Sequence, residues 1–199
     1  MSLMKHTRLA LAVTATALVL AGCSAESDDP TPSPAASIAN PATTSVRESA
    51  SAEVPGDTKD KVSPASEDAR LSVVEIRTGR HDGFDRVVYE LAGEGTPGWR
   101  VGYVNEATQQ GSGNEVAVSG DAVLEVLIDG STYPFEIGLE PYGGPDPLVA
   151  EPGGSVVEVT GSGVFEGVTQ SFVGIAERGT PFTVYSLTNP TRVVIDVAR

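Results

Sequence analysis

Side chains that could do chemistry are few in this chain of 199 residues. After the first ten residues the sequence holds one histidine, His81, and the whole chain has one cysteine, Cys23. A serine–histidine–aspartate triad would need His81, which lies in the turn-like stretch RHDGFD without a Gly-x-Ser-x-Gly elbow. A catalytic zinc site is poorly served by one histidine and carboxylates. The sequence therefore predicts a protein that is not an enzyme and has no cofactor.

The carboxylates offer two further kinds of site. His81, Asp82 and Asp85 would suit a hard cation such as calcium, but two acids in a loop are more often solvated turn formers, so we expect no metal site. Paired carboxylates for glycoside cleavage are the remaining catalytic option. Most acids of the strand-like runs fall at outward positions, where a solvated face explains them: Glu75, Glu90, Glu125, Glu158 and Asp196.

Aromatic side chains offer binding chemistry instead. Trp99 and Tyr103 point to one face of a strand-like run, where core packing is the simpler interpretation and ligand stacking the alternative. Tyr133, Phe135 and Tyr142 lie in a Pro/Gly-rich stretch, where a tyrosine can stack on a sugar or anchor a protein partner. The alternative is a small cluster of the loop's own aromatics. The candidate ligand-binding residues are Tyr133, Tyr142, Trp99 and Tyr103.

Net charge narrows the range of ligands. The chain carries 27 acidic against 13 basic residues, a formal charge of −14. From residue 70 onward, 18 acids stand against 8 arginines and no lysine, a formal −10. Such a domain is repelled by polyanions, so we expect no nucleic-acid partner and no attraction to anionic lipid surfaces.

The first 22 residues have the pattern of a lipoprotein signal peptide. Lys5 and Arg8 precede an apolar run over residues 9–21, which is shorter than the ~20 residues that span a bilayer. The run ends in Leu-Ala-Gly-Cys, which resembles a bacterial lipobox. We therefore expect a lipid on Cys23 that anchors an extracytoplasmic protein to the outer face of the cell membrane. A single cysteine also permits no disulfide within the chain.

Residues 23–70 are predicted to form a disordered tether. The segment is rich in Pro, Ser, Thr, Ala and charged residues and has almost no large apolar side chain. It cannot bury enough surface to offset its conformational entropy.

Residues 71–199 predict one all-β domain, an antiparallel two-sheet sandwich. Short β-branched runs alternate with Gly, Pro and Asn turn signals at a spacing of roughly 8–15 residues. The stretch 131–154 is too rich in Pro and Gly for central strands and should leave the sheets. The runs read as strands are residues 72–77, 86–91, 99–104, 115–120, 123–128, 155–159, 171–176, 182–187 and 192–197.

Two of these runs nearly repeat one another, FDRVVYEL at residues 84–91 and PTRVVIDV at 190–197. Each alternates an apolar face with a face that reads Arg, Val, acid. Laid antiparallel, Arg86 would lie opposite Asp196 and Glu90 opposite Arg192. Such cross-strand pairs contribute only about 0.2–1 kcal/mol each, but they favour this register over a slip. Chance likeness between two valine-rich strands is the alternative.

The order of several phrases along the domain resembles a known family. HDGFDRVVYEL, PGWRVGYV, SGNEVAVSG, GVFEG and NPTRVVIDV are similar to the AMIN domain, and more closely to the AMIN-like domain of actinobacterial lipoproteins, over residues 71–199. The resemblance implies two facing β-sheets and a non-catalytic module that binds peptidoglycan. We therefore expect a membrane-anchored cell-envelope lipoprotein whose β-domain binds cell-wall glycan. The alternative is an acidic interaction module that docks on an envelope protein.

Overall fold

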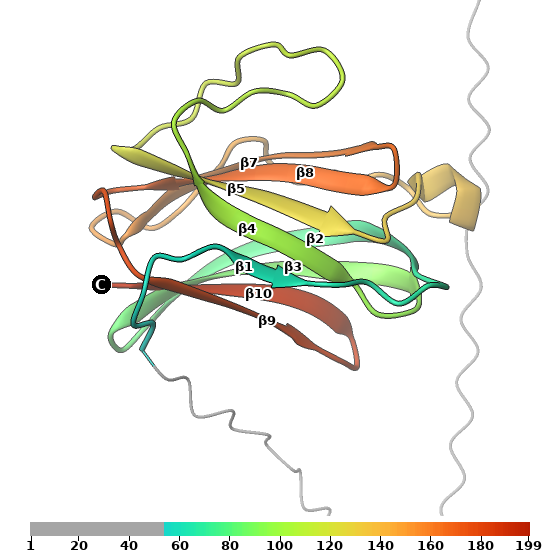
Figure 1. The fold of residues 1–199 in the computed structure, drawn as a ribbon, viewed down its shortest axis with the longest axis horizontal. Helices are drawn as coiled ribbons and strands as arrows, with labels where there is room; N and C mark the ends of the chain where they lie inside the picture. The colour runs from blue at the N-terminus through green and yellow to red at the C-terminus, as the bar shows by residue number, and fades with distance from the viewer. Residues whose placement is uncertain (1–53) are drawn as a thin grey trace, which may run out of the picture. The chain divides into compact units, whose positions relative to one another are not determined.

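The computed structural model describes residues 54–199, which form two antiparallel β-sheets and one short 3₁₀ helix, η1 (Pro134–Ile137) (Figure 1). One sheet has the strand order β1-β4-β5-β8-β7-β6 and the other β2-β3-β10-β9. The predicted all-β, two-sheet fold is confirmed. The strands are β1 (Lys61–Ser63), β2 (Arg70–His81), β3 (Phe84–Glu94), β4 (Gly98–Val104), β5 (Ala122–Asp129), β6 (Leu148–Val149), β7 (Val156–Phe165), β8 (Val168–Ile175), β9 (Phe182–Leu187) and β10 (Thr191–Ala198).

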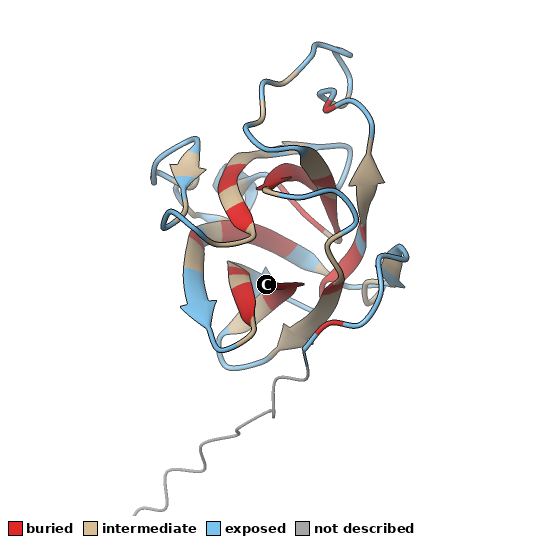
Figure 2. Ribbon diagram, turned by 90° about the vertical axis from the view of Figure 1, so that its left-hand side faces the viewer, coloured by how far each residue is buried: buried red, intermediate tan, exposed pale blue. Residues whose placement is uncertain are grey.

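The core lies between the two sheets and follows the alternation of the strand sequences. Figure 2 shows buried residues recurring along strands of both layers. The core face of β3 and β10 is the one predicted, because strand side chains alternate between faces. The six residues of this face are all 3% exposed or less: Val87, Tyr89, Leu91, Val193, Ile195 and Val197.

The duplicated strands β3 and β10 are antiparallel neighbours at the centre of the four-stranded sheet. Arg86 lies opposite Asp196, Val88 opposite Val194, and Glu90 opposite Arg192. The predicted register is confirmed at the backbone.

The folded part begins before Leu71. β1 lies in the segment assigned to the tether, yet its three residues pair with β4. The Phe182 N–H also donates to the Asp57 carbonyl over 2.9 Å. The tether prediction is therefore wrong at its C-terminal end, because backbone pairing needs no apolar side chain. The signal peptide, Cys23 and tether residues 23–53 lie outside the described residues.

The run at residues 115–120 is not a strand. Residues 105–121 form a loop that lies on the outer face of the six-stranded sheet, where the Ser119 N–H donates to the Glu158 carboxylate over 2.8 Å. Phe172 is 2% exposed although it lies outside the core between the sheets. The loop covers apolar surface on a face that the sequence pattern assigned to solvent.

Residues 131–154 leave the sheets as predicted, apart from the two-residue β6 at the sheet edge. Throughout residues 54–199, no helix has the length and apolar character needed to cross a membrane.

Candidate ligand-binding groove

The floor of the groove is an irregular stretch of β7. The register of β7 against β8 shifts between Thr160 and Gly163. Gly161 has a φ of 77°, which favours glycine, and a side chain at Gly163 would meet no heavy atom within 4 Å. Bulges of this kind often occur beside binding sites, because they bend the strand and interrupt its pairing. The strand is therefore open to solvent at this point.

Residues 131–154 form one wall and are fastened to the sheets at several points. The Asp146 carboxylate accepts hydrogen bonds from the Thr160 hydroxyl over 2.6 Å and from the Gly161 N–H over 3.0 Å. At the start of the segment, the Thr132 N–H donates to the Leu71 carbonyl over 2.8 Å. These contacts fix the segment beside the bulge.

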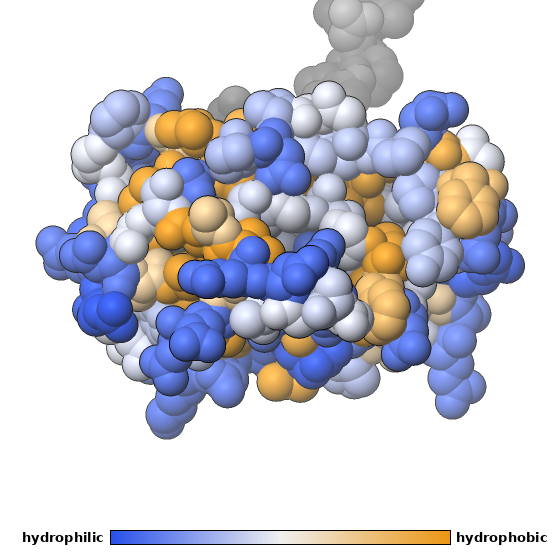
Figure 3. All heavy atoms as spheres, turned by 90° about the horizontal axis from the view of Figure 1, so that it is seen from above, coloured by the Kyte–Doolittle hydropathy of each residue, from blue (hydrophilic) through white to orange (hydrophobic). Residues whose placement is uncertain are grey.

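Bulge and wall enclose a groove of about 410 Å³ that both Tyr133 and Tyr142 line, together with Pro134 and Pro141. The structure thus brings together the two tyrosines that the sequence singled out. The Tyr133 ring is stacked on Phe135 with centroids 5.4 Å apart, and the two residues are 40% and 75% exposed. Figure 3 shows orange apolar patches among hydrophilic side chains, also toward the right, where Figure 1 places η1.

Tyr142 is more buried than Tyr133 and packs partly against the core between the sheets. Its hydroxyl donates to the Pro145 carbonyl over 3.4 Å. Burial, and then the nearby Asp146 and Glu75 carboxylates, raise the pKa of Tyr142. Tyr142 therefore keeps its hydroxyl proton at neutral pH.

Trp99 and Tyr103 are not part of this groove. Trp99 is 9% exposed and belongs to the core. The Tyr103 ring meets Phe182 edge-on at 5.7 Å, and its hydroxyl donates to the Thr180 carbonyl over 2.7 Å. Burial raises the pKa of Tyr103. For both residues the structure has the core-packing arrangement, which leaves Tyr133 and Tyr142 as the candidates.

A second pocket of about 180 Å³ adjoins the groove, and four lining residues are common to both: Gln109, Gly161, Gly163 and Val164. Phe165 and Gln110 line the second pocket only. Sequence reasoning missed both residues. The GVFEG turn signals the end of a hairpin, but it does not predict that the Phe165 ring lies against Gly111 in the loop at residues 105–121.

The predicted pair Arg86–Asp196 forms on the outer face of the four-stranded sheet. The Arg86 Nε donates to Asp196 Oδ1 over 2.6 Å and Nη2 to Oδ2 over 2.9 Å. Asp196 is 1% exposed and also accepts the Tyr185 hydroxyl at 3.2 Å. The hydrogen bond to Asp196 raises the pKa of Arg86. Asp196 is therefore a buried structural carboxylate and does not belong to a solvated face.

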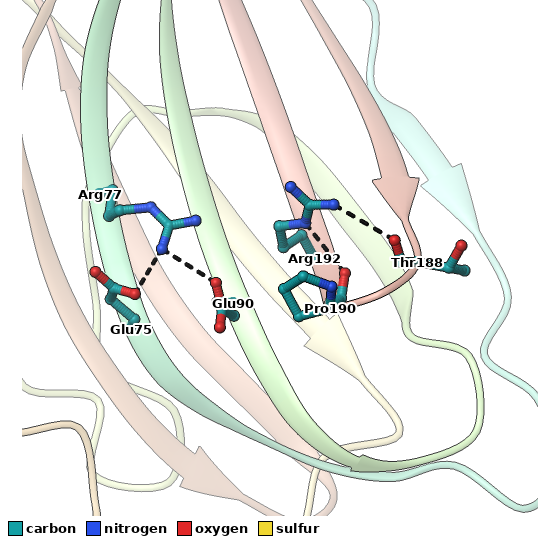
Figure 4. Close-up of polar contacts among 6 residues, drawn as sticks. All are labelled: Glu75, Arg77, Glu90, Thr188, Pro190 and Arg192. Atoms are coloured by element: carbon teal, nitrogen blue, oxygen red, sulfur yellow. Dashed lines mark hydrogen bonds and ion pairs between the residues drawn. The ribbon is translucent and has the colours of Figure 1, made fainter. Parts of the chain in front are cut away.

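The second predicted pair, Glu90–Arg192, does not form, although the two residues lie opposite each other (Figure 4). Glu90 accepts a hydrogen bond from Arg77 of β2 over 3.0 Å. Arg192 donates to the Pro190 carbonyl over 3.1 Å and to the Thr188 carbonyl over 3.4 Å. At this more exposed end of the sheet, water competes with the pair, and each side chain has a nearer partner.

The residues considered for a metal site are held apart. The His81 ring stacks on Phe84 at 4.8 Å. Asp85 is 6% exposed and accepts the Ser155 N–H at 2.6 Å, so it is not the solvated turn former that we expected. Within residues 54–199, no three His, Cys, Asp or Glu side chains are grouped to hold a metal ion.

Comparison with known proteins identifies the family of the domain. The model of the AMIN-like domain family matches residues 71–199, well over half of the chain. No curated protein and no solved structure matches the chain. The matched range covers every strand except β1 and the first residue of β2, Arg70, and it contains the whole groove. The chain therefore belongs to the AMIN-like domain family.

Proposed function

We propose that this domain is a non-catalytic cell-envelope module that binds peptidoglycan glycan in the groove between Tyr133 and Tyr142. The observation that carries the proposal is the meeting of these two tyrosines in one groove of about 410 Å³, on a wall fastened to the sheets. Membership of the AMIN-like family supports a place in the cell envelope.

The chemistry of the groove suits a sugar. Aromatic rings pack against the apolar C–H faces of a pyranose, and hydroxyl and amide groups hydrogen-bond its polar rim. The groove supplies the exposed Tyr133 ring, the Tyr142 hydroxyl and the Gln109 amide. Such contacts yield only a few kcal/mol after ordering costs, which corresponds to dissociation constants from about tens of micromolar to millimolar. A lipid on Cys23 would offset this weakness, because tethering raises the effective concentration near the wall.

Filling the groove tests the proposal. Gly163→Leu places a side chain where no heavy atom lies within 4 Å, and Gly56→Leu is the matched control, since Gly56 is equally open but does not line the groove. We expect a soluble chain that starts at residue 24, and so lacks the lipidated Cys23, to pellet with purified cell wall. Gly163→Leu alone should weaken pelleting about tenfold. Pelleting that is equal in both variants would contradict the groove as the site.

The same assay tests the absence of catalysis. Soluble muropeptides should not appear in the supernatant during incubation with the wall. Their steady release would show that a pair of the domain's carboxylates cleaves the glycan.

The second candidate, an acidic module that docks on a basic envelope protein, is favoured by the formal charge of −10 over residues 70–199. Salt separates the two candidates, because attraction between exposed opposite charges weakens as ionic strength rises while stacking persists. If pelleting with the wall is lost at high salt and is unchanged by Gly163→Leu, the result would favour the protein partner.

A further inference from the structure

The Phe165 ring forms a fixed aromatic surface at the second pocket, which we call the Phe165 pocket. Phe165 is 40% exposed, and its ring carbons lie 2.9 to 3.3 Å from where a side chain at Gly111 would begin. The ring is therefore held against the backbone of the loop at residues 105–121, while part of it faces solvent. An aromatic ring fixed in this way loses little entropy when a ligand stacks on it.

The polar groups beneath this platform are also held in place. Gln170 is 7% exposed, and its amide donates to the Thr108 carbonyl over 3.0 Å and to the Glu125 carboxylate over 2.7 Å. Its oxygen accepts the Gln110 N–H over 2.8 Å. These three bonds fix the loop to the sheet and so fix the shape of the pocket.

Gln110 leaves an acceptor unused at this pocket. Its side-chain oxygen is buried and has no hydrogen-bond partner among the described residues. A buried acceptor without a donor is unfavourable. A hydroxyl or amide N–H of a ligand that donates to this oxygen would therefore make the binding free energy more favourable. Gln110 is itself one of the residues that line the pocket.

Charge restricts what such a ligand can be. Among the described residues that line the two pockets there is no lysine or arginine, and Asp146 is the one carboxylate. Asp146 already accepts two hydrogen bonds from β7. With the domain at a formal −10, an anionic ligand would meet repulsion and no compensating cation.

We propose that the Phe165 pocket is a second glycan subsite, continuous with the Tyr133–Tyr142 groove, and that the two together hold an extended, uncharged glycan strand. The inference rests on the proposed function and adds to it a second stacking platform and the exclusion of anionic polymers. The two pockets adjoin each other, because both are lined by Gly161, Gly163 and Val164. A ligand long enough to reach both platforms binds more tightly than one that fills the groove alone.

Oligosaccharides of defined length test this inference on the soluble chain from residue 24. The neutral probes are N-acetylglucosamine trimer and hexamer, and the anionic probe is a hyaluronan hexamer of equal length. Calorimetric titration should show the neutral hexamer binding about tenfold more tightly than the trimer, and the hyaluronan hexamer at least about tenfold more weakly than the neutral hexamer. Equal affinity for trimer and hexamer, or for the two hexamers, would overturn the inference.

Phe165→Leu adds a readout that a structural defect would not produce. The change keeps an apolar side chain but removes the ring, and Val62→Ala on β1 is the control, because Val62 is 70% exposed and lines neither pocket. We expect Phe165→Leu to weaken hexamer binding about fivefold to tenfold and to leave trimer binding within about twofold. An equal loss for both lengths would count against a second subsite.

The two proposals fail differently. Suppose that Gly163→Leu weakens pelleting with the wall but the hexamer and the trimer bind with equal affinity. The proposal of a second subsite is then wrong, and the proposal of the groove is supported. If neither oligosaccharide binds and Gly163→Leu leaves pelleting unchanged, both proposals are wrong.

Discussion

At the scale of single residues, the strand register places Arg86 opposite Asp196 and Glu90 opposite Arg192, but only the first pair forms an ion pair. The Asp196 side chain is 1% exposed, so both of its oxygens need donors, and Arg86 and Tyr185 supply them. The Glu90 side chain is 25% exposed, and it pairs with Arg77 on the neighbouring strand. The repeat in the sequence predicted which residues lie opposite. It could not predict burial, which decides which pairs form.

This contrast predicts unequal effects of removing the two arginines. Arg86→Met should destabilise the protein by about 2–3 kcal/mol, because it leaves a buried carboxylate with the Tyr185 hydroxyl alone. Arg192→Met, the matched control at the opposite end of the pattern, should cost less than about 0.5 kcal/mol. Urea unfolding measures both. Similar losses for the two variants would mean that the Arg86–Asp196 pair has no special role in stability.

At the scale of elements, the period-two alternation of β-branched residues predicted the strands and the core face of β3 and β10. This alternation gave a wrong prediction where a loop with a strand-like sequence covers the sheet. Residues 115–120 carry a strand-like pattern, but they cover the outer face of the six-stranded sheet, where Glu158 accepts the Ser119 N–H. The β7 bulge depends on glycines that read equally well as a turn, so the second pocket could not be predicted from the sequence.

At the scale of elements, we predict that β1 contributes to the stability of the domain. A chain that starts at Leu71, the beginning of the family match, lacks the three β1 residue pairs with β4 and the hydrogen bond from Phe182 to Asp57. At about 0.5–1.5 kcal/mol per backbone hydrogen bond, we expect it to be less stable by about 2–4 kcal/mol than a chain that starts at Val54. Thermal unfolding of the two chains measures the difference. Equal midpoints would show that β1 adds nothing to the sandwich.

At the scale of the whole molecule, the sequence predicts three parts with separate tasks: an export and lipidation signal, a spacer, and a binding domain. The first part gives a prediction of its own. Cys23→Ser should move the protein from the washed membrane fraction to the soluble fraction, because Cys23 is the one cysteine of the chain and follows Leu-Ala-Gly. Fractionation followed by immunoblotting measures this, with Ser24→Ala as the control. Retention of Cys23→Ser in membranes at the wild-type level would rule out a lipid at this residue.

The candidate site was predictable from the sequence only in part, again for a reason at the scale of the whole molecule. Tyr133 and Tyr142 stood out because they lie in a Pro/Gly-rich segment outside the strand pattern. Their groove is completed by Gln109 and by Gly161 to Val164 of β7, which come from other parts of the chain, and no local pattern encodes that arrangement. Trp99 and Tyr103 are aromatic too, but Trp99 is buried in the core and Tyr103 packs against it.

The central claim, that the cleft between Tyr133 and Phe165 is where cell-wall glycan binds, is tested most directly by mapping the contact. Amide resonances of the ¹⁵N-labelled chain from residue 24 would be followed by NMR during titration with the neutral N-acetylglucosamine hexamer, which has the amino-sugar units of the wall glycan without its carboxylates. We predict progressive shifts at the residues lining the two pockets, with few at β9 or on the outer face of the four-stranded sheet. Shifts centred on those distant surfaces, or no shifts at millimolar ligand, would contradict the account.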